Sequence, residues 1–200
     1  MDFKKVVKLA IFIDHDNFAI SYCNKFNVNE VPIDVFGELS PNLIEYYKKH
    51  ILAHEFELVQ HTGTFLVVGI EEFINQEVKK RKEKLQEIDR KNGYVVTYRD
   101  RVNSYRPKGN QNGKKADFRL GKEKGVDSEI ICQLLVGAFF DHYDVCILLS
   151  DDMDYLPALE RVQLLFGKKV IQAGFQKKSK LRNQAYAHIP LEKSDHNLKE

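Results

Sequence analysis

Two short acidic runs contain the side chains of this chain that are best suited to chemistry. The run DHDN at 14–17 follows the apolar segment Val6–Ile13, and the run SDDMD at 150–154 follows the apolar segment 144–149. Carboxylates packed so closely repel one another, and a hard divalent cation such as Mg²⁺ or Mn²⁺ removes the conflict. A cation held in this way activates water and stabilises charge on a leaving oxygen, which is what phosphate chemistry needs.

The order of strands and helices brings a further carboxylate toward these runs. In an open parallel sheet, sites form outside the carboxyl ends of the strands, so both runs face one crevice if their strands are neighbours. Asp127 begins a predicted helix that runs to about Phe140, and a right-handed crossover starts that helix at the same edge of the sheet. Each aspartate alone is more often a turn former or a helix cap, but their convergence favours a functional cluster. The sequence predicts that cluster to contain Asp14, Asp127, Asp152 and Asp154.

The elements that must position these residues alternate between strand and helix. Apolar runs predict strands over Val6–Ile13, Glu55–Val68, 94–98, 144–149 and 169–173. Helical patterns cover 17–23, 71–92, 127–140 and 155–166. A further helix is predicted after Pro41, with this proline in its first turn. The sequence leaves open whether 65–68 continues the second strand or forms another. This alternation predicts an α/β fold with a mainly parallel five-stranded sheet and helices on both faces. We expect residues 1–175 to form one domain and 176–200 a polar extension, with Ala185–Ile189 docking as a helical turn.

Composition excludes some classes of protein and leaves others open. No apolar run approaches the roughly 20 residues that cross a bilayer, so we expect no membrane protein. The three cysteines are widely spaced with no CxxC motif, which favours free thiols and a cytoplasmic location. The 31 basic and 29 acidic residues give a net charge of +2, so binding of a polyanion requires local clustering of charge. Assembly into a homo-oligomer is left open.

Such a cluster of basic residues lies between Ser104 and Lys124. Two aromatic residues, Tyr105 and Phe118, lie among the cations. A single-stranded nucleic acid is bound by basic side chains that contact its phosphates and by aromatic side chains on which its bases stack. We therefore predict a nucleic-acid-binding segment containing Arg106, Lys108, Lys114, Lys115, Arg119, Lys122 and Lys124. The charged run KKRKEK at 79–84 is interpreted instead as the solvated face of a helix.

Several runs of this chain resemble the NYN domain, a branch of the PIN-like nuclease superfamily. These are FIDHDN, KGVD at 124–127 before an apolar helix, and YDVCILLSDDMDYLPALE followed by GKKV, so that the resemblance covers about residues 9 to 175. It implies a three-layer α/β/α PIN-like sandwich and a ribonuclease that uses Mg²⁺ or Mn²⁺ on single-stranded or structured RNA. Asp14, Asp127, Asp152 and Asp154 match the family's acidic positions, and Asn17 and Ser150 match its supporting positions.

The chain also departs from the family pattern. The family commonly has glycine where this chain has His15 and Asp151, and often has an acid at the position of Gln133. Asp151 therefore adds a negative charge near the predicted site, and we count it with Asp16 among the supporting residues. His15 is equally well read as a general acid or as a hydrogen-bonding neighbour of the aspartates.

The leading hypothesis is a ribonuclease, a metal-dependent hydrolase that cleaves phosphodiester bonds and leaves a 5′-phosphate. One alternative is a haloacid-dehalogenase-like phosphatase with Asp14 as nucleophile, because Asp14 and Asp16 have the Asp-x-Asp spacing after a strand. Phe18 departs from that family's threonine or valine. The other alternative is a non-catalytic RNA-binding module that keeps the fold.

Overall fold

The computed structural model describes residues 5–52, 58–71, 76–101, 125–176 and 179–191. Its centre is a parallel sheet in the order β3-β2-β1-β4-β5-β6. The strands are β1 Val6–Asp14, β2 Leu58–Glu71, β3 Tyr94–Arg101, β4 Val145–Leu149, β5 Lys169–Gly174 and β6 Ala187–Pro190. The helices are α1 His15–Phe26, α2 Ile33–His50, α3 Gln76–Asn92, α4 Val126–Phe139, α5 Leu156–Phe166 and α6 Lys180–Gln184, with a 3₁₀ turn, η1, at Met153–Tyr155. The predicted α/β fold is confirmed, with six strands in place of five.

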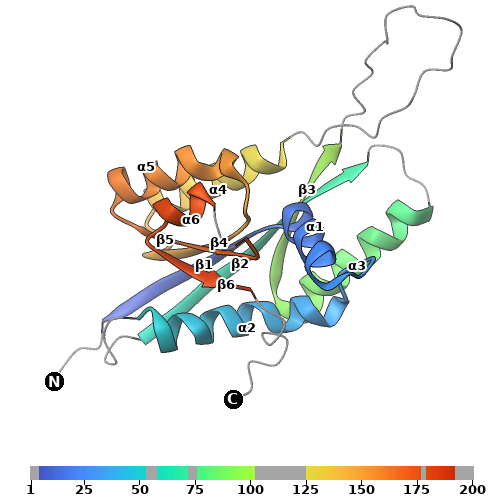
Figure 1. Cartoon of the computed structure of the whole chain (residues 1–200), viewed down its shortest axis with the longest axis horizontal. Coiled ribbons are helices and arrows are strands. Elements are labelled where there is room, and N and C mark those ends of the chain that lie inside the picture. The colour runs from blue at the N-terminus through green and yellow to red at the C-terminus, as the bar shows by residue number, and fades with distance from the viewer. Residues whose placement is uncertain (1–4, 53–57, 72–75, 102–124, 177–178, 192–200) are drawn as a thin grey trace, which may run out of the picture.

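Helices cover both faces of the sheet, as a three-layer sandwich requires. Leu9, Ile11 and Ile13 of β1 pack into a core with α1, α2 and α3, whereas Ala10 and Phe12 face the core formed with α4, α5 and α6. Figure 1 shows α4, α5 and α6 on one side of the sheet and α2 and α3 on the other. Burial on both faces explains why β1 is a continuous apolar run instead of an alternating one.

The two central strands are β1 and β4, and the chain leaves them in opposite directions. They pair in parallel from Leu9 with Val145 to Ile13 with Leu149. From β1 the chain continues to β2 and β3 on one side, and from β4 it continues to β5 and β6 on the other. The connections diverge at this switch point, and open α/β sheets form their binding crevice at such a point, here outside the carboxyl ends of β1 and β4. The two acidic runs follow these two strand ends.

Two elements differ from the sequence prediction, and a third answers a question that the sequence left open. Helix α2 begins at Ile33, so Pro41 lies inside it and not in its first turn. A buried stripe continues on both sides of the proline, and its burial offsets an interior-proline cost of about 3 kcal/mol; the stripe consists of Phe36, Leu39, Leu43 and Tyr47. The second strand is continuous to Glu71 with one irregularity opposite Leu9 and Ala10. Residues Ala187–Pro190 form β6, where a helical turn was predicted.

None of the helices that the structure describes is long and apolar enough to cross a membrane.

Candidate active site

Asp14 occupies the end of β1 and caps helix α1. Its Oδ1 accepts the backbone N–H of Asn17 at 3.1 Å, which is an ordinary N-cap bond. Its Oδ2 accepts the Tyr155 hydroxyl at 2.9 Å and the Ser150 hydroxyl at 3.4 Å. The side chain is buried, and strand, helix and loop together fix its position.

Asp127 approaches Asp14 from the first turn of α4. The N-cap of that helix is Gly125, with a φ of 97° that favours glycine, so the helix begins one residue before Asp127, its predicted start. Its Oδ1 lies 2.9 Å from the hydroxyl oxygen of Tyr155. The Tyr155 hydroxyl thus contacts a carboxylate at the end of β1 and another at the start of α4. Asp127 and Asp14 lie close together, as the sequence predicted.

Tyr155 is the residue of this site that the sequence reasoning missed. A hydroxyl carries one proton and donates it to one acceptor at a time, so Asp14 and Asp127 compete for the same donor. The side chain is fully buried, and that burial raises the pKa of Tyr155 above its usual value, which keeps the hydroxyl neutral. The available signal was a tyrosine directly after the run SDDMD, which the helical pattern assigned to a helix start.

Both carboxylates ionise less readily than free aspartate. Burial raises the pKa of Asp14 to about 6, and the charges of Asp127 and Asp16 add to the effect, while bonds from Asn17 and Tyr155 oppose it. Burial likewise raises the pKa of Asp127. When both carboxyls are ionised, the described part of the site is therefore short of positive charge.

Asp152 and Asp154 lie in the loop after β4, and their charges also raise the pKa of Asp127. Asp152 is partly buried and caps η1, because its Oδ1 accepts the N–H of Asp154 at 3.0 Å, and Asp154 is exposed. Ser150 joins this loop to the buried end of the site, since its Oγ accepts the N–H of Asp152 at 3.1 Å and contacts Asp14.

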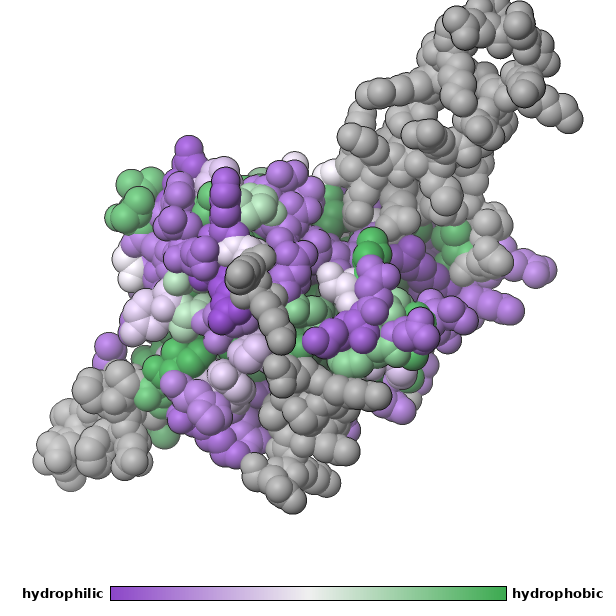
Figure 2. Space-filling model, in the orientation of Figure 1, coloured by the Kyte–Doolittle hydropathy of each residue, from purple (hydrophilic) through white to green (hydrophobic). Residues whose placement is uncertain are grey.

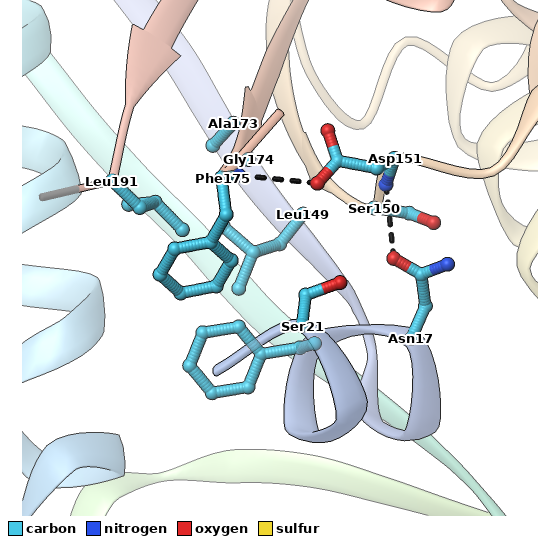
Figure 3. A pocket seen from close by; sticks show the side chains of 10 residues that line it. Asn17, Ser21, Leu149, Ser150, Asp151, Ala173, Gly174, Phe175 and Leu191 are labelled. Carbon is cyan, nitrogen blue, oxygen red and sulfur yellow. Dashed lines mark hydrogen bonds between the residues drawn. The ribbon is translucent and has the colours of Figure 1, made fainter. Parts of the chain in front are cut away.

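Asp151 and the side chain of Asn17 brace the strand ends, whereas Asn17 contacts Asp14 through its backbone N–H. The N–H of Asp151 donates to Asn17 Oδ1 at 3.0 Å, which ties the β4 loop to α1 (Figure 3). The Asp151 carboxylate is buried and accepts N–H groups from Phe175 at 3.1 Å, Gln176 at 3.3 Å and Gln172 Nε2 at 3.0 Å. Burial raises the pKa of Asp151, and these bonds oppose the shift. Both of its oxygens are used between β4 and β5.

Asp16 points toward helix α3. Its Oδ1 lies 2.6 Å from Nη2 of Arg81 and 2.8 Å from Nδ1 of His15. The His15 ring stacks on Phe36 with centroids 5.8 Å apart. Arg81 therefore compensates the charge of Asp16, and His15 belongs to this cluster.

Gln133, which stands where the family often has an acid, lies on α4 and binds a neighbouring carboxylate. Its Nε2 donates to Glu129 Oε1 at 2.8 Å, and Glu129 is paired with Arg99. The hydrogen bond from Arg99 lowers the pKa of Glu129. Glu129 is thus ionised, and the positive charge of Arg99 compensates its negative charge.

The predicted nucleic-acid-binding residues lie outside the described residues; they are Arg106, Lys108, Lys114, Lys115, Arg119, Lys122 and Lys124. Among the described residues, no lysine or arginine pairs with Asp14, Asp127, Asp152 or Asp154.

Among the residues that the structure describes, no group of three or more histidine, cysteine, aspartate or glutamate side chains is placed so that it could hold a metal ion. The chemistry of the donors nevertheless fits a hard cation, since carboxylate oxygens predominate and no described lysine or arginine compensates their charge. The Tyr155 hydroxyl lies between the two carboxylates, within hydrogen-bond distance of both Asp14 and Asp127.

The sheet order and the acidic crevice define a doubly wound α/β protein with its candidate site at the switch point. The NYN domain family matches residues 8–192, so this chain belongs to that family and has its nuclease-like fold. A solved structure of a protein of unknown function from Vibrio parahaemolyticus is similar in fold, with a TM-score of 0.58 and 17% identity. The similarity covers 96% of this chain and 98% of that one. No curated protein matches this chain.

Proposed function

We propose that this NYN protein is a metal-dependent ribonuclease that hydrolyses RNA phosphodiester bonds. The observation that carries the proposal is the convergence of Asp14 and Asp127 on one buried hydroxyl at the switch-point crevice, with Asp152 and Asp154 in the adjoining loop. We propose that these four carboxylates hold Mg²⁺ or Mn²⁺.

When bound, the cation would supply activation of a water molecule and stabilisation of charge on the leaving oxygen. The residues around the carboxylates hold them in position. The β1 end and the Asn17 N–H fix Asp14, the first turn of α4 fixes Asp127, and Ser150 links the outer loop to the inner carboxylate. Release of the 3′ oxygen in this reaction leaves a 5′-phosphate.

The test compares the wild-type protein with Asp127→Asn on single-stranded and structured RNA in the presence of Mn²⁺, Mg²⁺ or EDTA. We expect the substitution to lower the cleavage rate at least about 10- to 100-fold, because even residues that only support a metal site have effects of this size. Asp34→Asn is the matched control, since Asp34 also lies in the first turn of a helix but is exposed.

Cleavage that survives in Asp127→Asn, or that persists in EDTA, would place the activity at another site or in a contaminant. Cleavage that is lost equally in Asp34→Asn would argue against a specific role of the crevice.

A second candidate is an RNA-binding module without catalysis, which Gln133 favours because its amide occupies the position of a family acid and binds Glu129. Retention of RNA without cleavage under any divalent metal would support it. The phosphatase alternative is less favoured, because Asp16, its required general acid, is buried in an ion pair with Arg81.

A further inference from the structure

Helix α3 brings basic side chains to the edge of the sheet that holds the candidate site. Arg81 Nη2 lies 2.6 Å from Asp16 Oδ1, and Asp16 follows Asp14 by two residues. Figure 1 shows the first half of α3 on the same side as α1, and Figure 2 shows hydrophilic side chains over this region. The charged run at 79–84, expected to be only a solvated face, therefore borders the crevice at Arg81.

The helical period separates the cations of this run into two groups. Lys84 pairs with Glu30, just after α1, at 3.1 Å, and Lys80 precedes Lys84 by one turn on the same side of the helix. Lys79 and Lys82 follow the other edge of the buried stripe formed by Val78 and Leu85. We name Lys80, Arg81 and Lys84 the α3 basic face.

The cations of the α3 basic face are available to an anion. Lys80 is exposed, and no described residue forms an ion pair with it. Lys84 and Glu30 have side chains that are 58% and 75% exposed, and such surface pairs are weak enough to exchange partners. The Arg81 side chain is 35% exposed and uses Nη2 on Asp16, which leaves further N–H donors.

We propose that the α3 basic face binds the RNA backbone next to the scissile phosphate, an inference that rests on the proposed function. The acidic crevice by itself repels a polyanion, so a bound strand requires cations close to it. Arg81 is the described cation that contacts the acidic run directly, and its bond to Asp16 holds the guanidinium in place before RNA arrives. Lys80 and Lys84 extend the positive charge along one side of the helix, where backbone phosphates are bound without regard to sequence.

The test measures binding of a fluorescent single-stranded oligouridylate by anisotropy over a series of salt concentrations, with EDTA present to prevent cleavage. The Lys80→Gln/Lys84→Gln protein is compared with Lys79→Gln/Lys82→Gln, which removes the same charge from the other flank of the same helix. We expect the first variant to bind about 10-fold more weakly and to lower the slope of log K against log salt by about 1.4, since each phosphate contact on a single strand contributes about 0.7. The control should change binding less than about twofold, with the slope unaltered.

Equal effects of the two double substitutions, or no effect of either, would overturn the α3 basic face, as would failure of the wild-type protein to bind RNA. Cleavage assays with Mn²⁺ on the same proteins separate this result from the proposed function. Selective loss of binding without any cleavage would support the face and reject the ribonuclease. Cleavage by proteins whose two double substitutions bind RNA identically would support the ribonuclease and reject the α3 basic face.

Discussion

Among the residues that the structure describes, the hydroxyl of Tyr155 is the single group that contacts both Asp14 and Asp127, and this makes it a positioning residue for the site. It lies 2.9 Å from an oxygen of Asp14 and 2.9 Å from an oxygen of Asp127. Without it, two aspartates with raised pKa values face each other with no shared donor. Their spacing would then depend on repulsion and on whatever cation is bound.

We therefore expect Tyr155→Phe to lower both stability and activity. The loss of a hydrogen bond to a charged group costs about 1.5–3 kcal/mol of unfolding free energy, and a displaced carboxylate should reduce RNA cleavage about 10- to 100-fold. Urea unfolding in EDTA and cleavage assays in Mn²⁺ measure the two effects.

Tyr143→Phe is the matched control for this substitution. Tyr143 is also fully buried, but its hydroxyl donates to the carbonyl of Leu134 and touches neither carboxylate. This control should lose stability and keep its cleavage rate. A Tyr155→Phe protein with unchanged cleavage would show that the hydroxyl does not position the site.

At the scale of elements, the ends of β4 and β5 are locked together by Asp151 over Gly174. A β-carbon added at Gly174 would lie 2.3 Å from Asp151 Oδ1 and 2.4 Å from Gln172 Nε2. No real side chain makes such contacts, so the brace between the two strands requires glycine here. Because Asp151 also holds Asn17, the brace reaches the start of α1 beside Asp14.

Gly174→Ala should consequently destabilise the protein by about 1–3 kcal/mol, as overpacking of a closed site does. The measurement is a double-mutant cycle of unfolding free energies with Asp151→Ala. If the clash with the carboxylate causes the loss, the alanine at 174 should cost clearly less in the Asp151→Ala background. Equal costs in both backgrounds would assign the loss to Gln172 or to the backbone of β5.

Much of this arrangement was predictable from local pattern, and the remainder depends on contacts between distant segments. The buried strands and the acids at their carboxyl ends predicted that Asp14 and Asp127 meet, because topology alone brings them together. Tyr155 was missed because its contacts with Asp14 and Asp127 form only when three segments that are distant in the sequence come together in the fold. The turn from β1 into α1 directs the side chain of Asp16 toward Arg81. The sequence spacing of the two aspartates does not show that Asp14 faces the site and Asp16 faces α3. The four-residue strand β6 is too short to show a pattern of its own.

Over the whole molecule, the net charge of +2 conceals two opposed regions. The crevice gathers aspartates without a described cationic partner, whereas the first half of α3 gathers lysines and Arg81. Asp16 and Arg81 join the two regions through one ion pair. The near-neutral total thus conceals an acidic cluster, for which we propose a cation, beside the α3 basic face, for which we propose a polyanion.

The acidic pocket should also shape the pH dependence of the stability of the whole fold. In the folded protein the pKa of Asp14 is raised from 3.8 to about 6, so between these values the folded state binds more protons than the unfolded state. Its contribution is therefore most favourable below about pH 4 and is lost as pH rises through about 6, by about 3 kcal/mol in total. In the absence of divalent cations, ionisation of this buried carboxyl opposes folding.

Asp14→Asn should remove that penalty, because the new amide oxygen can accept the Asn17 N–H and the amide nitrogen can donate to Tyr155, which leaves the tyrosine proton for Asp127. We expect the variant to be more stable than the wild-type protein at pH 8 in EDTA and to keep only about a third of that advantage at pH 4.5, as measured by urea unfolding. Asp16→Asn is the control, since it breaks the ion pair with Arg81 and should destabilise the protein at pH 8. If Asp14→Asn also destabilises the protein at pH 8, Asp14 is held as a favourable anion and the crevice is not short of positive charge.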